Sequence, residues 1–325
     1  MNRLEKKFLQ QLRDRQLVTG GDHVLAAVSG GPDSMALLHL LKEVAPVVPC
    51  RISAAHCNFQ LRGEESLGDE RFVREQCTLA EVECFIVRFD TAAASALRKK
   101  SLEETARELR YGWFASLLEE HGMTKIATGH HVSDNAETML FNLFRGTSLL
   151  GLKGIRAMHG RVTRPLLLLN RSEIVDYLHE KKIPYRTDDS NFGIDYDRNF
   201  IRNRVIPLVE ERFRHKLLPS LQRLSEQAGE LEAFLEEYFE RLTTSRPGLS
   251  LLQGRLDARE LGQLSVFEQK EIFKRALQES GASPDAAMLQ RLVSLLHSQP
   301  GRKIVVSGRL VVAWKGRYLY FQTIP

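Results

Sequence analysis

The chain has few cysteines and no long apolar run, which argues against a cysteine-bound metal site and against a membrane-spanning segment. Only four of its 325 residues are cysteine, and Cys50, Cys57, Cys77 and Cys84 form no C-x2-C pair. This pattern argues against a zinc or iron–sulfur site and is typical of reduced thiols in a cytoplasm. No apolar run reaches the roughly 18 residues that a membrane span needs, and residues 1–15 lack a signal-peptide core. We therefore expect a cytoplasmic protein without a membrane segment.

Two common phosphate-binding motifs are also absent. A Walker loop needs a second glycine followed at once by Lys and then by Ser or Thr. In the nearest match Gly151 is followed by Leu152, so Lys153 comes one position too late. No G-x-G-x-x-G sequence follows the first predicted strand. Neither loop is therefore expected to bind a nucleotide here.

The segment S-G-G-P-D-S at residues 29–34 carries the clearest chemical signal. It follows an apolar run at 23–28 that predicts a buried strand, and it precedes an apolar stretch at 35–41 that predicts a helix. A strand, a Gly-Gly turn and a helix N-terminus form an anion site, because the N–H groups converge and the helix dipole favours negative charge. Pro32 suits the first helical turn, where its missing N–H costs little.

Strand and helix patterns alternate over the first half of the chain and predict an α/β fold, with a parallel sheet covered by helices on both faces. Ligands of such sheets bind at the carboxyl ends of the strands, which places 29–34, 56–58 and 129–134 around one crevice. The predicted strands are 23–28, 51–57, 83–89 and 124–129, and the predicted helices are 33–43, 66–80, 102–120 and 134–145.

The pattern changes after residue 145 and becomes mainly helical from about 215. We therefore expect a first domain over 1–214 and a smaller, mainly helical domain over 215–325 that ends in a basic three-stranded meander. The predicted elements are a strand near 162–168, helices near 171–180 and at 197–206 ending at Pro207, helices at 216–241, 257–281 and 285–297, and the meander at 303–321.

Charge is distributed unevenly, although the net charge is only +5. Residues 300–325 hold five Lys or Arg and no acid, whereas 226–240 is rich in Glu. Segregated basic stretches suggest a polyanionic partner such as RNA. A solvated charged surface would give the same pattern, so charge alone leaves both interpretations open.

Five stretches in a fixed order identify a family. The segment at 29–34 resembles the pyrophosphate loop of the N-type ATP pyrophosphatases, a Rossmann-like group. The others are A-H-C-N-F-Q-L-R-G-E-E-S at 55–66, E-T-A-R-E-L-R-Y at 104–111, A-T-G-H-H-V-S-D-N-A-E-T at 127–138 and R-N-F-I-R-N-R at 198–204. Together they resemble the tRNA(Ile)-lysidine synthetases over roughly residues 22–215, and the tail resembles the family's short form, with one helical domain and a compact basic end.

The resemblance implies a two-step reaction. ATP adenylates the C2 oxygen of the first anticodon cytidine in an isoleucine tRNA with a CAU anticodon, and free L-lysine then displaces AMP to give lysidine. ATP, Mg²⁺, L-lysine and the tRNA are the implied partners, and no protein partner is expected. The resemblance assigns ATP binding to Ser29, Gly30, Gly31, Pro32, Asp33 and Ser34, with His56, Asn58, Gly129 and His130.

Three acidic residues are the candidate chemical groups. Asp33 and Asp134 would hold Mg²⁺ against the phosphates, and Glu137, on the same helix face as Asp134, would hold the lysine amine. Helix capping by Asp33 and dipole complementation by the pair are the alternatives. The family often carries an acid where Ser133 stands, which shifts our assignment to Asp134.

Basic residues of the matched stretches and of the tail are the remaining candidates. Arg107 and Arg110 would contribute to catalysis, although an arginine on a helix is usually solvated. The expected tRNA contacts are Arg145, Arg198, Arg202, Arg204, Arg302, Arg309 and Arg317.

Three other functions remain possible at this point. A tRNA thiolase with the same loop generally needs reactive or cluster-binding cysteines, and no C-x2-C is present. A small-molecule amide or amidine synthetase would share the loop, but the basic tail favours RNA. A nucleotide- and RNA-binding module without catalysis would not need three acids in one crevice.

Overall fold

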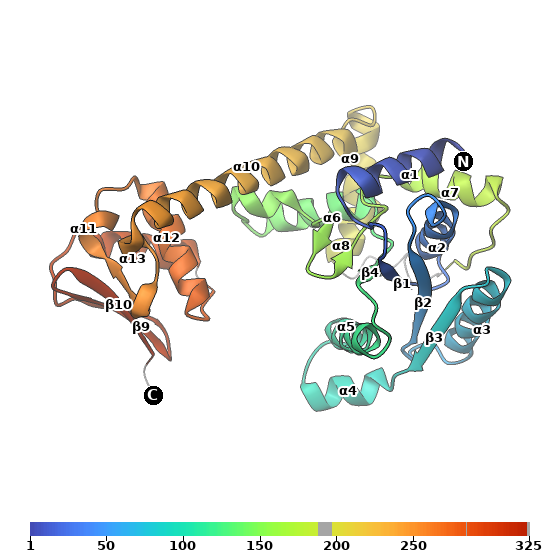
Figure 1. Cartoon of the computed structure of the whole chain (residues 1–325), viewed down its shortest axis with the longest axis horizontal. Coiled ribbons are helices and arrows are strands. Elements are labelled where there is room, and N and C mark those ends of the chain that lie inside the picture. Colours follow the sequence, from blue (N-terminus) through green and yellow to red (C-terminus); the bar gives the residue numbers. More distant parts are fainter. Residues whose placement is uncertain (188–196, 284, 324–325) are drawn as a thin grey trace. The chain divides into compact units, whose positions relative to one another are not determined.

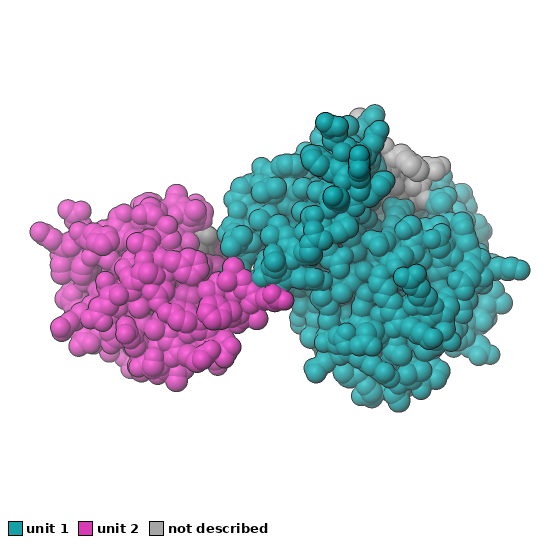
Figure 2. Space-filling view, turned by 90° about the horizontal axis from the view of Figure 1, so that it is seen from above, with its two compact units in different colours: residues 1–229 teal, residues 230–325 magenta. Residues whose placement is uncertain are grey.

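The computed structural model describes residues 1–187, 197–283 and 285–323. The chain forms two compact units, residues 1–229 and 230–325, which Figure 2 shows in different colours. The division lies within helix α10 (Leu217–Ser245), further along the chain than residue 214. Among the described residues, no helix is both long and apolar enough to cross a membrane.

The first unit is built on a six-stranded sheet with the order β3-β2-β1-β4-β6-β5 (Figure 1). Five of the strands run parallel, and β5 pairs antiparallel with β6 at one edge. The predicted parallel sheet is therefore confirmed, but the strand expected near 162–168 is only two residues long and forms the second strand of a hairpin whose turn contains Gly160. The strands are β1 (His23–Ala27), β2 (Arg51–Asn58), β3 (Glu83–Arg88), β4 (Lys125–Ala127), β5 (Met158–His159) and β6 (Val162–Thr163).

Helices cover both faces of this sheet because its strands alternate their side chains. Val24 of β1 packs with the helices of one face, among them Leu37 and Ile174, whereas Leu25 packs with Phe114 on the other face. The helices are α1 (Arg3–Asp14), α2 (Pro32–Val44), α3 (Glu64–Leu79), α4 (Thr91–Arg98), α5 (Leu102–Glu120), α6 (Val132–Phe144), α7 (Arg171–Glu180), α8 (Asp197–Phe200) and α9 (Ile206–Arg212).

Two local features of this unit differ from the sequence pattern. The helix α4 was not predicted, and it begins at Asp90, whose side chain accepts a hydrogen bond from the Ala93 N–H. The basic helix does not end at Pro207, because the chain passes through a π-helical turn (Ile201–Val205) and Pro207 occupies the first turn of α9, where proline is tolerated.

The second unit packs helices against a four-stranded antiparallel sheet with the order β7-β10-β9-β8. The predicted three-stranded meander is present, and the unpredicted β7 extends it. The helix expected over 257–281 is interrupted, because Ser265 starts a new helix with a capping box. The elements are β7 (Arg255–Asp257), α11 (Ala258–Leu261), α12 (Val266–Glu279), α13 (Ala286–Leu296), β8 (Lys303–Ser307), β9 (Leu310–Lys315) and β10 (Tyr318–Thr323).

A buried carboxylate joins α3 to the ends of β2 and β3. Glu70 accepts hydrogen bonds from Arg88 Nε at 2.7 Å, from Arg88 Nη2 at 3.0 Å and from Asn58 Nδ2 at 3.0 Å. Asn58 Oδ1 in turn accepts from the Gln60 N–H at 3.0 Å. The hydrogen bonds from Arg88 hold the pKa of Glu70 at about 2, well below its ordinary value. Glu70 therefore fixes the loop that follows β2.

We expect Glu70→Gln to lower the free energy of unfolding by roughly 1–3 kcal/mol, because the amide is uncharged and has only one oxygen to accept the hydrogen bonds from Arg88 and the buried Asn58. Denaturant titration of both proteins measures this difference. Glu75→Gln, at an exposed position of the same helix, is the matched control and should change little.

The difference should depend on pH. Because the pKa of Glu70 is lowered in the fold, its contribution is complete above the unfolded value of about 4.3 and is lost as the pH falls toward the folded value. The difference in stability between the wild type and Glu70→Gln should therefore shrink as the pH falls from about 4 toward about 2. A gap that stays constant down to pH 3 would contradict this role.

Candidate functional site

The loop between β1 and α2 is shaped by its own hydroxyl groups. Ser34 Oγ accepts hydrogen bonds from the N–H groups of Ser29 at 3.1 Å and Gly30 at 3.2 Å, and it donates to the Gly31 carbonyl at 2.9 Å. Gly30 has φ +95°, which favours glycine, and Gly31 is the N-cap of α2. The predicted strand–turn–helix arrangement is present, and Pro32 lies in the first helical turn.

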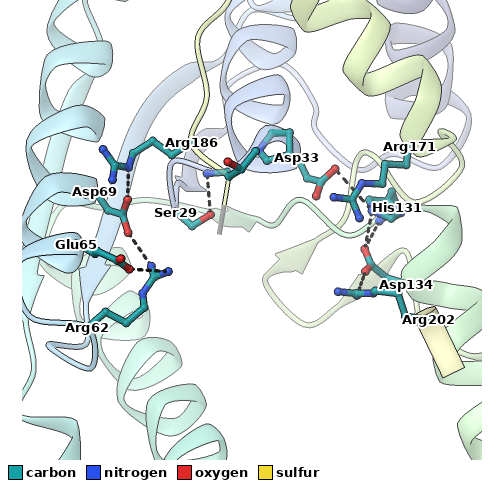
Figure 3. A pocket seen from close by; sticks show the side chains of 13 residues that line it. Ser29, Asp33, Arg62, Glu65, Asp69, His131, Asp134, Arg171, Arg186 and Arg202 are labelled. Atoms are coloured by element: carbon teal, nitrogen blue, oxygen red, sulfur yellow. Dashed lines mark hydrogen bonds and ion pairs between the residues drawn. The ribbon is translucent and has the colours of Figure 1, made fainter. Parts of the chain in front are cut away.

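A buried imidazole lies between two of the predicted acids. His131 is the N-cap of α6, and its Nδ1 accepts a hydrogen bond from the Ser133 N–H, so Nε2 carries the ring proton. This Nε2 lies 3.6 Å from Asp33 Oδ1 and 3.6 Å from Asp134 Oδ2 (Figure 3). The buried Asp33 Oδ1 has no hydrogen-bond partner. Burial raises the pKa of Asp33, His131 opposes the rise, and Asp134 adds to it.

One arginine binds both acids of α6. Arg202 donates from Nε to Glu137 Oε1 at 2.6 Å, and its Nη2 donates to Glu137 Oε2 at 2.8 Å and to Asp134 Oδ1 at 3.0 Å. Asp134 also caps its own helix by accepting from the His131 N–H at 2.9 Å. Burial raises the pKa of Glu137, although Arg202 opposes the rise. The structure therefore turns Arg202 toward the acids, where sequence reasoning had assigned it to the tRNA.

The chain after β4 passes close to the loop. A Cβ at Gly129 would lie 3.2 Å from the Asp33 carbonyl oxygen, so only glycine permits this approach without displacement. The next residue, His130, shares a hydrogen bond with Thr128 Oγ1 at 2.9 Å. Burial lowers the pKa of His130 to about 4, so its ring is neutral near pH 7.

A first cavity of about 590 Å³ opens beside the loop and is lined mainly by charged side chains. Figure 3 shows Arg62, Glu65, Asp69 and Arg186 on one side of it, and Asp33, His131, Asp134, Arg171 and Arg202 on the other. Asp69 accepts from Arg186 Nε at 2.5 Å and from Arg62 Nη2 at 2.7 Å.

The backbone N–H of Arg186 donates to the Gly30 carbonyl at 2.9 Å, so this segment is fastened to the loop. Sequence reasoning missed Asp69, Arg171 and Arg186. Arg171 and Arg186 lie on segments far along the chain that no motif connects to residues 29–34, and no sequence signal marks Asp69.

A second cavity of about 460 Å³ lies over the carboxyl ends of β1, β2 and β4. Apolar side chains including Ala55, Phe59 and Phe114 line one part of it, and Arg107, Arg110 and Tyr111 of α5 line another. Both cavities share Ser29, Gly31, Asp33 and Asp134. The arrangement suits an apolar ring system in the second cavity, joined to an anionic chain that crosses the loop into the first.

Two residues that were predicted to contact the nucleotide, His56 and Asn58, instead hydrogen-bond to the protein around the loop. His56 is buried and hydrogen-bonds through Nδ1 to the Val28 carbonyl at 2.9 Å, immediately before the loop. Asn58 is buried against Glu70, as described above. Neither lines the two cavities.

The predicted tRNA contacts fall into separate groups. Arg145 and Arg198 both stack on the Phe141 ring, with guanidinium carbons 5.2 and 5.4 Å from its centroid, and Arg204 is exposed. In the second unit Arg302 and Arg309 are exposed. Arg317 donates to the buried Asp257 at 2.5 Å, so this arginine supports the fold of its unit.

A metal ion would need ligands from a substrate. Within the described residues, no group of three or more His, Cys, Asp or Glu side chains is arranged to hold an ion. Asp33 and Asp134 nevertheless supply two carboxylates on either side of His131, and Asp33 Oδ1 is unpartnered. This donor set fits a hard divalent cation that keeps phosphate or water ligands.

Comparison with known proteins agrees with this geometry. Residues 1–209 match the PP-loop domain family. The chain is 54% identical over 322 residues to tRNA(Ile)-lysidine synthase from Chlorobaculum tepidum, covering 99% of this chain and 97% of that protein. It is 36% identical over 305 residues to tRNA(Ile)-lysidine synthase from Bacteroides thetaiotaomicron, covering 93% and 68%.

A solved structure supports the fold. The U34-tRNA thiolase NcsA from Methanococcus maripaludis aligns with a TM-score of 0.56 and 20% identity, covering 68% of this chain and 77% of that chain. At this identity the likeness concerns the fold alone. The domain match and the near full-length identities together show that the chain belongs to the tRNA(Ile)-lysidine synthase family of PP-loop proteins.

Proposed function

We propose that the chain is an ATP-dependent ligase that joins free L-lysine to C2 of the first anticodon cytidine of an isoleucine tRNA with a CAU anticodon. ATP transfers its AMP group to the cytidine O2 with release of pyrophosphate, and the lysine ε-amine then attacks C2 and displaces AMP. The observation that carries the proposal is the position of Asp33, on a PP-loop between a partly apolar cavity and a charged one. The 54% identity to the Chlorobaculum tepidum enzyme supports it over nearly the whole chain.

The ATP would lie across the loop. Its adenosine suits the second cavity, where Ala55 and Phe114 supply apolar surface. The pyrophosphate would lie against the loop of residues 29–34 at the start of α2, where the helix dipole favours its charge. We assign Arg107 and Arg110, which line the second cavity, to stabilising the charge of the adenylation step.

Asp33 and Asp134 would hold Mg²⁺, as their donor set allows. When bound, Mg²⁺ neutralises charge on phosphate oxygens and so favours departure of pyrophosphate. His131 lies between the two carboxylates, with its Nε2 3.6 Å from an oxygen of each. Its orientation is set by the Ser133 N–H, so the hydroxyl at position 133 is not needed for this purpose.

The lysine step requires an unprotonated amine. A lysine ε-ammonium has a pKa near 10.4, so a nearby base must take its proton before attack at neutral pH. Glu137 is a candidate because it is buried and its pKa is raised, and Arg202 orients it through two hydrogen bonds. We assign lysine binding to Glu137.

The tRNA would contact exposed cations of both units. In the first unit these are Arg145, Arg198 and Arg204, and in the second they lie on the basic tail. A thiolase function is not favoured, because the sequence has no C-x2-C pair and the near full-length relatives carry the lysidine synthase name.

We expect Asp33→Asn to keep the fold but to slow adenylation by a factor of about 10² or more, the scale of a lost electrostatic contact in a transition state. Pyrophosphate release from ATP in the presence of tRNA, without lysine, measures this step. The pKa of Asp33 is raised, so this carboxylate takes up a proton at a higher pH than an ordinary aspartate does. As the pH is lowered, wild-type adenylation should therefore begin to fall at that higher pH.

Asp176→Asn, at an exposed position of α7, is the matched control and should release pyrophosphate at the wild-type rate. Near-normal release of pyrophosphate by Asp33→Asn would contradict the assignment of Asp33 to the adenylation step.

Asp134→Asn and Glu137→Gln should fail at different steps. Asp134 faces Asp33 across His131, so its amide variant should lose adenylation, while the remaining carbonyl oxygen still caps α6. Glu137→Gln should form the adenylate and then transfer lysine slowly. Adenylate formation is measured first without lysine, and lysine transfer is measured after lysine is added. Equal failure of both variants at adenylate formation would contradict the assignment of Asp134 and Glu137 to different steps.

Charge reversal in the tail should weaken tRNA binding. We choose Arg302→Glu, Arg309→Glu and Lys315→Glu together and leave Arg317 in place, because its bond to Asp257 supports the fold. Each lost phosphate contact should flatten the slope of log K against log salt by a little under one unit, while ATP affinity stays constant. Filter binding at several salt concentrations measures both quantities.

A control with the same change in charge carries Arg241→Glu, Lys270→Glu and Arg291→Glu on helices of the second unit. An unchanged slope and affinity in the tail variant would mean that the RNA lies elsewhere, on the face that carries Arg198 and Arg204.

A further inference from the structure

A buried amide holds the side of α6 that faces away from the acids. Successive residues of an α-helix lie about 100° apart around its axis, so Asn135 projects about 160° from Glu137 and about 100° from Asp134. Asn135 is only 7% exposed. Its Oδ1 accepts a hydrogen bond from the Ile155 N–H at 2.6 Å, and its Nδ2 donates to Ser225 Oγ at 3.2 Å. Both ends of the amide are therefore engaged by the protein.

Ser225 joins this amide to two further segments. It lies in the part of α10 that belongs to the first unit, which extends to Gly229, and this part runs beside α6 (Figure 1). The Ser225 Oγ accepts from Asn135 and donates to the Lys153 carbonyl at 2.6 Å. A single hydroxyl thus connects α6, α10 and the 3₁₀ helix Leu149–Lys153.

The chain after Lys153 passes too close to α6 for a side chain. Gly154 has φ +71°, and a Cβ there would lie 2.1 Å from Asn135 Oδ1 and 2.8 Å from Met139 Cγ. Only glycine permits this approach without displacement. The approach brings the Ile155 N–H onto the amide, so the position of this side of α6 is closely specified.

The contacts on the opposite side of α6 are of a different kind. Arg202 binds Asp134 and Glu137, and His131 lies beside Asp134. These two carboxylates are the ones that we assign to Mg²⁺ and to lysine, so bound substrates would compete with Arg202 and His131 for them. No substrate contact is assigned to the partners of Asn135, so its hydrogen bonds would persist through both steps of the reaction.

We propose that Asn135 and Ser225 are positioning residues, which fix the rotation of α6 about its axis and thereby the direction of Asp134 and Glu137. Neither of the two lines the cavities beside the loop, so they act through the helix. A displacement of about 1 Å at a reacting group can cost about 10²-fold in rate, so a tether on the far side of the helix can control the chemistry. The effect on adenylation rests on the proposed function, whereas the effect on α6 does not.

Ser225→Ala removes the link to α10 and leaves the bond between Asn135 and Ile155 in place. At saturating tRNA its rate of adenylation should fall about tenfold, while the KM for ATP stays within about twofold of the wild type. Ser225→Thr keeps a hydroxyl and should restore most of the rate. Ser220→Ala, which removes an exposed hydroxyl five residues earlier on α10, is the matched control.

Backbone hydrogen exchange of the full chain without ligands gives a readout that needs no reaction. In Ser225→Ala the N–H of Ile155 and those at the start of α6 should exchange roughly fivefold faster than in the wild type, because the tether no longer holds them. The N–H of Leu25 in β1, on the far side of the sheet's core, should exchange at the wild-type rate. Ser225→Thr should return the first group to wild-type exchange.

Two results would overturn the proposal. In one, Ser225→Ala adenylates tRNA at the rate of the Ser220→Ala control. In the other, its rate falls only in proportion to the unfolded fraction, measured by circular dichroism at the assay temperature, which assigns the tether to stability alone. If the wild type releases no pyrophosphate with tRNA, the proposed function fails, and hydrogen exchange still decides whether Ser225 holds α6.

Discussion

The site depends on one buried imidazole held between two carboxylates. His131 can present Nε2–H to Asp33 and Asp134 only because its Nδ1 is occupied by a backbone N–H at the start of α6. Asp134 caps the same helix start by accepting a hydrogen bond from the His131 N–H, so the contacts that cap α6 also position the side chains of the site. Without the ring, two carboxylates would face each other in a poorly solvated crevice, where like charges raise one another's pKa.

The rest of the first unit keeps these groups in reach of one another. Gly129 lets the chain after β4 pass within van der Waals contact of the Asp33 backbone, and the Arg186 N–H binds the Gly30 carbonyl from the opposite side. Behind the loop, His56 holds Val28 and Glu70 holds Asn58. A rigid scaffold of this kind limits the reorganisation that a charged transition state would otherwise require.

Much of the first unit's fold and site could be predicted from the sequence, because local patterns mark the ends of strands and the starts of helices. The alternation of strands and helices predicted the parallel sheet. Because ligands of such sheets bind at the carboxyl ends of the strands, residues 29–34 and 129–134 were predicted to lie together. Partnerships across long separations could not be predicted. Arg202 matches a basic face by spacing, yet a π-helical turn and the acids of α6 direct it inward. Arg317 likewise looks like a free cation until Asp257 is placed beside it.

Charge separation around the loop determines how a nucleotide can lie. The shared junction of the cavities is negative at Asp33 and Asp134, while arginines surround it on the α5 side and beside α3. The two carboxylates at the junction repel a polyphosphate unless a cation neutralises them. The arginines on the α5 side and beside α3 attract it away from the junction in both directions. A bound divalent cation would therefore set the point at which the chain of phosphates crosses the loop, and the arginines would set its direction. The buried guanidinium of Arg164 belongs to the same positive side: one of its nitrogens donates to the Arg156 carbonyl at 2.7 Å, whereas its Nε has no hydrogen-bond partner.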